Sequence, residues 1–113
     1  MKQFVILLSL ILMVSCSDPE INIHAPLEGQ TYVTEAYIYI SATVNDEDGI
    51  KRVTYKIYGN TYDLFPAGSP VTYDLLATQS MYNFASGYEV EIIIEAEDDL
   101  GNIMNKKVTV KHS

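Results

Sequence analysis

The chain has 113 residues, with 15 acidic side chains against 7 basic ones and a formal net charge of −8. This excess of acid excludes nucleic-acid binding by phosphate neutralisation, which requires a face rich in Lys and Arg. It also opposes direct attraction to an anionic membrane surface. Hydrophobic residues make up 48% of the chain, so a packed core is expected rather than disorder.

The first 15 residues have the layout of a secretory signal. Lys2 precedes an apolar run over residues 4–14, and the small residue Ser15 stands directly before Cys16, the chain's single cysteine. The run is well short of the roughly 20 residues that a membrane-spanning helix needs. A positive start, a short apolar stretch and a small residue at the cut are typical of a cleaved signal peptide. We therefore expect residues 1–15 to be removed, which leaves enough chain for one small domain.

The end of this segment resembles the signal of bacterial lipoproteins, in which the cysteine is lipidated and becomes the first mature residue. Met13 stands where that signal prefers Leu. The alternative is an ordinary secretory signal that contains a cysteine, but a free exported thiol with no disulfide partner would be a liability. The resemblance implies a diacylglycerol and an N-acyl chain such as palmitate on Cys16, which exceeds the two signals needed for stable anchoring. We expect a lipid anchor at Cys16 that attaches the protein to a membrane.

Residues 16–20 are expected to form a short acidic tether after the lipid. The sequence Ser17-Asp18-Pro19-Glu20 resembles the tag that some Gram-negative lipoproteins carry for delivery to the outer cell surface. A solvated linker without a sorting role is the alternative. The expected location is the cell envelope, at the outer membrane, with surface display favoured.

From residue 21 onward the dominant hydrophobic period is two, which is typical of half-buried strands. Ile38, Ile40, Ala42 and Val44 alternate with Tyr and polar residues, and Tyr88, Val90, Ile92, Ile94 and Ala96 alternate mainly with glutamates. The same period predicts strands at 52–57 and 104–111, and a short strand at 21–23 stopped by Pro26. The less regular segment 64–87 is expected to supply a strand at 71–76 and another at 82–84.

Four turn and strand motifs resemble those of bacterial immunoglobulin-like domains in secreted and surface proteins. They are Pro26-Leu27-Glu28-Gly29, the run from Ala42 to Ile50 with Asn45-Asp46-Glu47-Asp48-Gly49, Ile57-Tyr58-Gly59-Asn60, and Gly87-Tyr88-Glu89-Val90 leading to Ala96-Glu97-Asp98-Asp99-Leu100-Gly101-Asn102. The resemblance implies an all-β fold: a single immunoglobulin-like β-sandwich of about seven strands over residues 21–111. Such sandwiches serve as spacers, adhesins and binding modules, so the fold alone does not define a function.

The acidic turns are the one candidate for metal chemistry. Asp46, Asp48, Asp98 and Asp99 fall in two turns that a sandwich could bring to the same end, and calcium takes six to eight oxygens from such side chains. However, Asp and Asn are preferred in turns because they satisfy the local backbone, and the spacing matches no EF-hand loop. We expect turn residues and no cofactor, with calcium as the alternative.

No local motif pairs a nucleophile with a base, and His24 and His112 lie near opposite ends of the chain. We therefore expect no enzyme activity. The glutamates of 89–97 are expected to form a solvated ladder with Arg52, Lys56, Lys107 and Lys111 on neighbouring strands. The outward Tyr37 and Tyr39, with Tyr32, Tyr58, Tyr62 and Tyr73, suggest a tyrosine-rich surface, although β propensity alone could explain them.

These observations predict a lipid-anchored, non-catalytic envelope protein that acts in adhesion or in protein or glycan binding at the cell surface. The alternative is a structural or accessory subunit of a larger outer-membrane complex. A small hydrolase is the least favoured class.

Overall fold

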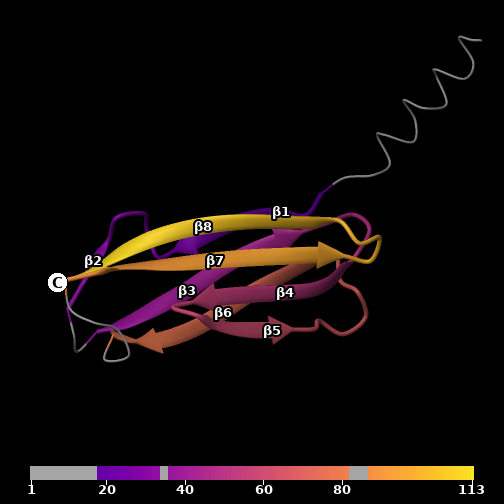
Figure 1. Ribbon diagram of the computed structural model, residues 1–113. Coiled ribbons are helices and arrows are strands. Elements are labelled where there is room, and N and C mark those ends of the chain that lie inside the picture. Colours follow the sequence, from indigo (N-terminus) through magenta and orange to yellow (C-terminus); the bar gives the residue numbers. More distant parts are fainter. Residues whose placement is uncertain (1–17, 34–35, 82–86) are drawn as a thin grey trace, which may run out of the picture.

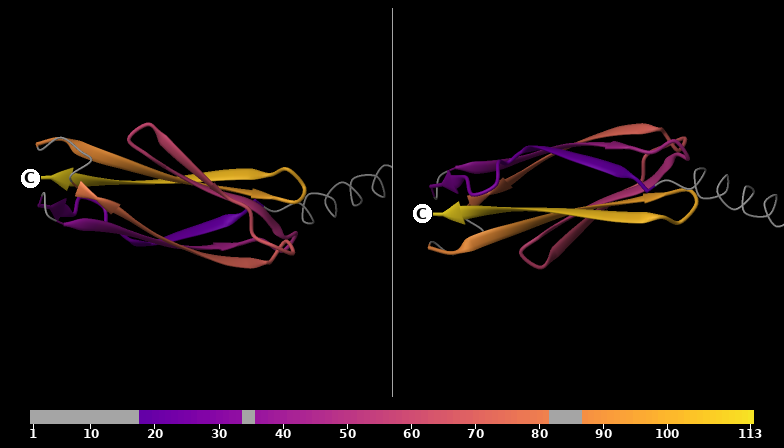
Figure 2. Two further views of the ribbon diagram at one scale, coloured as in Figure 1. Left: turned by 90° about the horizontal axis from the view of Figure 1, so that it is seen from below. Right: turned by 90° about the horizontal axis from the view of Figure 1, so that it is seen from above.

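The computed structural model describes residues 18–33, 36–81 and 87–113, which form a sandwich of two β-sheets (Figure 1). One sheet has three strands in the order β1-β3-β6, and the other has five in the order β2-β8-β7-β4-β5. The strands are β1 Glu20–Ala25, β2 Thr31–Tyr32, β3 Tyr37–Asn45, β4 Ile50–Ile57, β5 Asn60–Leu64, β6 Thr72–Ser80, β7 Glu89–Asp98 and β8 Ile103–His112. The two edge-on views show the sheets as separate layers (Figure 2). The expected all-β, immunoglobulin-like sandwich is confirmed.

The core lies between the sheets and is built by the alternation seen in the sequence. The inward residues Ile38 and Ile40 of β3 and Ile92 and Ile94 of β7 are fully buried. Since successive side chains of a strand point to opposite faces, each strand presents one apolar face to the other sheet. Ile92, in the middle of β7, is therefore buried as expected.

The chain changes sheets early, between β1 and β2. β1 pairs antiparallel with β3 in one sheet, and β2 pairs in parallel with the end of β8 in the other. The connection is held by Gly29 N, which donates to Thr109 O at 2.8 Å, and by Thr109 N, which donates to Glu28 Oε2 at 2.8 Å. This crossing brings the chain from the edge of the three-stranded sheet to the edge of the five-stranded sheet, beside β8.

Several details of the fold differ from the sequence interpretation. Tyr88 was expected on the buried face of its strand, but β7 begins at Glu89 and the Tyr88 side chain is 66% exposed. β2 and β5 were not anticipated, and β6 extends to Ser80, beyond the expected 71–76. The strand expected at 82–84 lies outside the described residues. The first long strand, the glutamate-rich strand and the strands near 52–57, 104–111 and 21–23 are where they were expected.

One end of the sandwich gathers the acidic turns. The β3–β4 turn and the β7–β8 turn both lie at the end where the chain enters β1, and the C-terminus lies at the opposite end (Figure 1). We call the first end the acidic end. Within the described residues, no helix is long and apolar enough to cross a membrane.

Candidate functional site

An aspartate continues the buried face at the end of two strands: Asp46 directly follows β3, and Asp98 is the last residue of β7. Ile38, Ile40, Ala42 and Val44 point inward along β3, and Asp46 is the next residue of that series. In the same way Ile92, Ile94 and Ala96 of β7 are followed by Asp98. Because β3 and β7 lie in different sheets, their inward ends face each other across the sandwich. The fold therefore places two carboxylates at the end of the core.

The turn after β3 is built around Asp46. Asp48 N donates to Asp46 Oδ1 at 2.8 Å, and Gly49 N donates to Asp46 O at 3.2 Å, as in a turn whose first residue caps its own backbone. This part of the expected turn chemistry is present.

The β3–β4 and β7–β8 turns are in direct contact. Asp99 N donates to Gly49 O at 3.0 Å, which joins the two turns through their backbones. Gly49 has φ of +92°, and a Cβ atom at this position would lie 2.8 Å from Asp99 Oδ2 and 2.9 Å from Ser69 O. The close approach therefore depends on the absence of a side chain at residue 49.

Three of the four aspartates named from the sequence come together at this contact. Carboxylate oxygens of Asp46, Asp48 and Asp98 all lie within 4.8 Å of one another. Asp46 is 5% exposed and Asp98 is fully buried, whereas Asp99 is exposed and does not belong to the group. We call Asp46, Asp48 and Asp98 the aspartate cluster. The alternation of β7 in the sequence was a signal that could have distinguished Asp98 from Asp99. Asp98 continues the inward series of Ile92, Ile94 and Ala96, and Asp99 does not.

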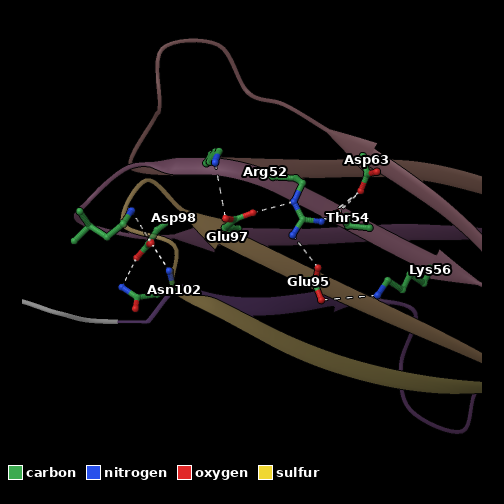
Figure 3. Close-up of polar contacts among 10 residues, drawn as sticks. Arg52, Thr54, Lys56, Asp63, Glu95, Glu97, Asp98 and Asn102 are labelled. Atoms are coloured by element: carbon green, nitrogen blue, oxygen red, sulfur yellow. Dashed lines mark hydrogen bonds and ion pairs between the residues drawn. The ribbon is translucent and has the colours of Figure 1, made fainter.

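Asp98 is held in its ionised form by its own turn (Figure 3). Its Oδ1 accepts from Leu100 N at 3.0 Å and Asn102 N at 2.8 Å, and its Oδ2 accepts from Asn102 Nδ2 at 2.9 Å. Burial alone would raise the pKa of Asp98, but these hydrogen bonds outweigh it and the pKa lies below its usual value. Burial raises the pKa of Asp46, and the neighbouring Asp98 carboxylate raises it further.

The outer face of the five-stranded sheet carries a ladder of paired charges centred on Arg52 (Figure 3). Arg52 Nε donates to Glu97 Oε1 at 3.1 Å, and Arg52 Nη2 donates to Glu95 Oε2 at 3.0 Å. Lys56 Nζ lies 3.8 Å from Glu95 Oε1. On β8, Lys107 Nζ lies 3.4 Å from Glu91 Oε2. Glu91, Glu95 and Glu97 of β7 are thus paired by the strands on both sides, as expected for a ladder, whereas Glu89 and Lys111 are shown only as register neighbours.

Two carboxylate pairs on this face lack the geometry of a catalytic pair. Glu91 and Glu95 line one groove of about 400 Å³, but residues four apart on a strand are about 13 Å apart. Glycoside hydrolysis needs two carboxyl groups at most about 9.5 Å apart. Glu95 and Glu97 are closer in sequence, but both bind the same guanidinium. This geometry is that of a structural ladder.

The outer face of the three-stranded sheet differs because it is rich in tyrosine and, among the described residues, carries no ion pair between Lys or Arg and Asp or Glu. Tyr37 and Tyr39 of β3 are 56% and 65% exposed, and Leu76 of the neighbouring β6 is 81% exposed. The register pairs Tyr39 with Thr78 and Ser41 with Leu76, so Tyr39 and Leu76 are diagonal neighbours. A groove of about 290 Å³ runs between the two strands at this point. We call Tyr37, Tyr39, Ser41, Leu76 and Thr78 the tyrosine face.

A row of hydrogen-bonded polar groups crosses the same outer sheet surface. His24 Nε2 of β1 lies 2.8 Å from Thr43 Oγ1 of β3, which donates to Asp74 Oδ1 of β6 at 2.9 Å. All three side chains lie on the solvent side of the sheet beside the tyrosine face. Sequence reasoning missed this row and Leu76, because residues 64–87 gave no clear register from which their faces could be assigned.

The remaining tyrosines do not extend the tyrosine face. Tyr32 and Tyr73 pack partly against the core, and burial raises the pKa of Tyr32. Tyr62 stacks on Tyr55, with ring centroids 4.7 Å apart. The expected tyrosine-rich surface is therefore wrong for Tyr32 and Tyr73, which are partly buried against the core. Cys16, the expected lipidation site, lies outside the described residues.

Comparison with solved structures supports the fold. The chain matches the fibronectin(III)-like modules of CbhA from Clostridium thermocellum with a TM-score of 0.62 and 18% identity, over 82% of this chain and 94% of that one. It also matches a Niemann-Pick type C2 protein from the Japanese carpenter ant with a TM-score of 0.48 and 17% identity, over 86% of this chain and 90% of that one. The match to the Niemann-Pick type C2 protein, with its TM-score below 0.5, carries no argument about this chain.

A search of the curated proteins finds no match. A family model described as "Bacterial Ig domain" matches residues 19–83. This match covers more than half of the chain and includes β1 to β6. The chain therefore belongs to the bacterial Ig domain family.

Proposed function

We propose that this protein is a lipid-anchored, non-catalytic component of the bacterial envelope whose Ig-like domain binds a protein or glycan through the tyrosine face. Family membership agrees with a binding or structural role, and it leaves the ligand undefined. The observation that carries the proposal is the exposure of Tyr37, Tyr39 and Leu76 on one face of neighbouring strands.

The chemistry of the tyrosine face supports recognition of a partner. Tyrosine offers a rigid apolar ring and a polar tip, a combination enriched in binding surfaces. The neighbouring row of His24, Thr43 and Asp74 adds hydrogen-bonding groups with fixed orientation. Stacking on rings beside directed polar groups suits a glycan as well as a protein segment.

The lipid anchor is supported by the sequence of residues 1–16. An apolar run that ends before the single cysteine predicts export and acylation at Cys16. The domain is acidic, so a lipid rather than surface charge would hold it at a membrane. We place the protein at the outer membrane and favour display at the cell surface.

A matched pair of tyrosine substitutions tests the binding face. Tyr39→Ser should weaken retention on a panel of immobilised glycans or envelope proteins at least about tenfold, since a tyrosine at the centre of an interface contributes about 2 kcal/mol or more and about 1.4 kcal/mol corresponds to a tenfold change. Tyr88→Ser removes an equally exposed tyrosine from the segment just before β7, away from the tyrosine face, and should leave retention unchanged. Equal retention by both variants and the parent would refute the tyrosine face.

The role of an accessory subunit is the second candidate, and the edge position of β6 favours it. In the described part of the chain, β6 pairs on one side only, with β3. An exposed edge strand with a large apolar side chain such as Leu76 can accept a further strand from a partner. Crosslinking from residue 76 to one envelope protein in intact cells would support this role over glycan binding.

A further inference from the structure

The aspartate cluster contains two oxygen atoms that turn chemistry leaves unexplained. Asp46 Oδ2 and Asp48 Oδ2 are buried, and neither has a hydrogen-bond donor. The capping contact in the β3–β4 turn uses only Asp46 Oδ1. A buried acceptor without a donor bears its full desolvation cost, so in native proteins such atoms indicate a bound water, an ion or a functional role.

In the described part of the chain, no Lys or Arg forms an ion pair with the cluster. Among residues 18–33, 36–81 and 87–113, the ion pairs of Lys and Arg go to Glu91, Glu95, Glu97 and Asp63, and none goes to Asp46, Asp48 or Asp98. Asp46 is 95% shielded from solvent and Asp98 completely so. Buried charges are normally paired or coordinate a metal.

We propose that Asp46, Asp48 and Asp98 bind one calcium ion between the β3–β4 and β7–β8 turns. This proposal departs from the expectation of turn residues alone, and it is independent of the lipid anchor and the tyrosine face. Calcium–oxygen distances of 2.3–2.6 Å place two ligands of one ion up to about 5 Å apart. The cluster's oxygens lie within 4.8 Å of one another and already meet this limit.

Calcium fits the site better than magnesium. Magnesium gives up its water shell reluctantly and usually keeps several waters, whereas calcium accepts many oxygen ligands in flexible geometry. Asp46 and Asp98 offer oxygens from inside the protein, where a hydrated magnesium ion would find little room. A groove of about 260 Å³, lined by Asp18, Glu20, Asn45, Asp46 and Glu47, lies beside the cluster and reaches it at Asp46.

A shared proton is the competing account of the cluster. If Asp46 is protonated, its carboxyl group can donate to Asp98, and the two side chains are near enough for this contact. The two accounts differ in their response to an isosteric amide. Asn at position 46 could still donate to Asp98, but it would remove one of three anionic calcium ligands.

The test uses the purified full-length protein in a non-ionic detergent, freed of divalent cations by a chelator that is then removed. Calorimetric titration with calcium chloride should show one ion bound per chain. Calcium at a hundredfold excess over its dissociation constant should raise the melting temperature by about 10 °C or more. Magnesium at equal ionic strength should produce less than half of that shift.

The variants identify the ligands. Asp46→Asn and Asp48→Asn should each weaken calcium binding at least about tenfold, which is the lower range for perturbed metal sites. Asp48 is only half-buried, so this variant keeps the test sound if Asp46→Asn folds poorly. Asp99→Asn removes the same charge from an exposed neighbour outside the cluster and should change the affinity less than about twofold, because exposed charges near a site are screened.

Two results would overturn the calcium proposal. The first is a parent protein with no calcium-specific shift and an Asp46→Asn variant at least as stable as the parent, which would establish the shared proton. The second is an equal stabilisation by calcium and magnesium that survives Asp48→Asn, which would mean that the cations only screen the net charge.

Discussion

Gly49 is the residue at which the two acidic turns meet. Its φ of +92° belongs to the left-handed region, and its missing side chain leaves room for Asp99 Oδ2 and Ser69 O. Gly101 of the neighbouring turn has a similar φ of +88°, but a Cβ there would contact nothing within 4 Å. The two glycines therefore share the backbone requirement and differ only in the space around them.

Replacing each glycine by alanine separates these two effects. Gly101→Ala should cost about 1–2 kcal/mol of unfolding free energy, the cost of left-handed backbone for an L-residue. Gly49→Ala should cost about 2–4 kcal/mol, because the overpacking of a tight contact adds to the same backbone cost. Urea unfolding of both variants measures the difference. Equal losses would mean that the turns are not in close contact.

At the scale of the element, β7 displays the alternation on which the fold depends. Its buried residues Val90, Ile92, Ile94 and Ala96 face the core, and the intervening residues lie on the outer face that carries the charge ladder. The strand lies between β4 and β8, so both neighbours constrain its register. A shift of one residue would move every apolar side chain of β7 to the solvent face.

Two adjacent substitutions in β7 test this register. Ile92→Ala should destabilise the domain by about 2–5 kcal/mol, through lost burial and the cavity that remains. Glu91→Ala should stay within about 0.5 kcal/mol, since the Glu91–Lys107 pair at 3.4 Å is exposed on both sides. Denaturant melts of the two variants provide the comparison. Similar losses for both would contradict the observed register.

The strands that could be predicted from sequence are those whose alternation is strict. β3 and β7 carry regular apolar faces, and their positions follow from period alone. β6 has one fully buried residue, Leu75, so its hydropathy shows no clear period and its extent follows from pairing with β3. β5 is mostly exposed and is specified by its pairing with β4. Such tertiary pairing is not written in local sequence.

The candidate site was predictable to a similar degree. Turn composition named four aspartates, and the sandwich topology allowed both turns to lie at one end. Which aspartates converge depends on the alternation of inward and outward residues along β3 and β7. This alternation directs Asp46 and Asp98 inward and leaves Asp99 in solvent. The buried, unpartnered oxygens of Asp46 and Asp48 depend on the contact between the turns and could not be inferred from composition.

At the scale of the whole molecule, the acidic end lies where the chain enters the domain (Figure 1). With Cys16 lipidated as proposed, the three residues 17–19 could separate β1 from the lipidated residue by about 14 Å at most. The acidic end would then face the membrane, and the C-terminal end would point away from it. The tyrosine face lies on the side of the sandwich, along β3 and β6, where it stays accessible in this orientation.

The charge of the molecule makes the role of the lipid testable. Because the chain carries a net charge of −8, it is repelled by anionic lipid, and electrostatic binding should not replace a lost anchor. Cys16→Ala should therefore move the protein from the detergent phase to the aqueous phase in phase partitioning, and it should abolish incorporation of labelled palmitate. Ser17→Ala alters the neighbouring residue without removing the thiol and should partition like the parent.

The Cys16→Ala protein should also fail to bind anionic vesicles at low ionic strength, where screening is weakest and any electrostatic attraction would be largest. A Cys16→Ala variant that remains in the detergent phase would show that the hydrophobic segment itself, and not an acyl chain, holds the protein in the membrane.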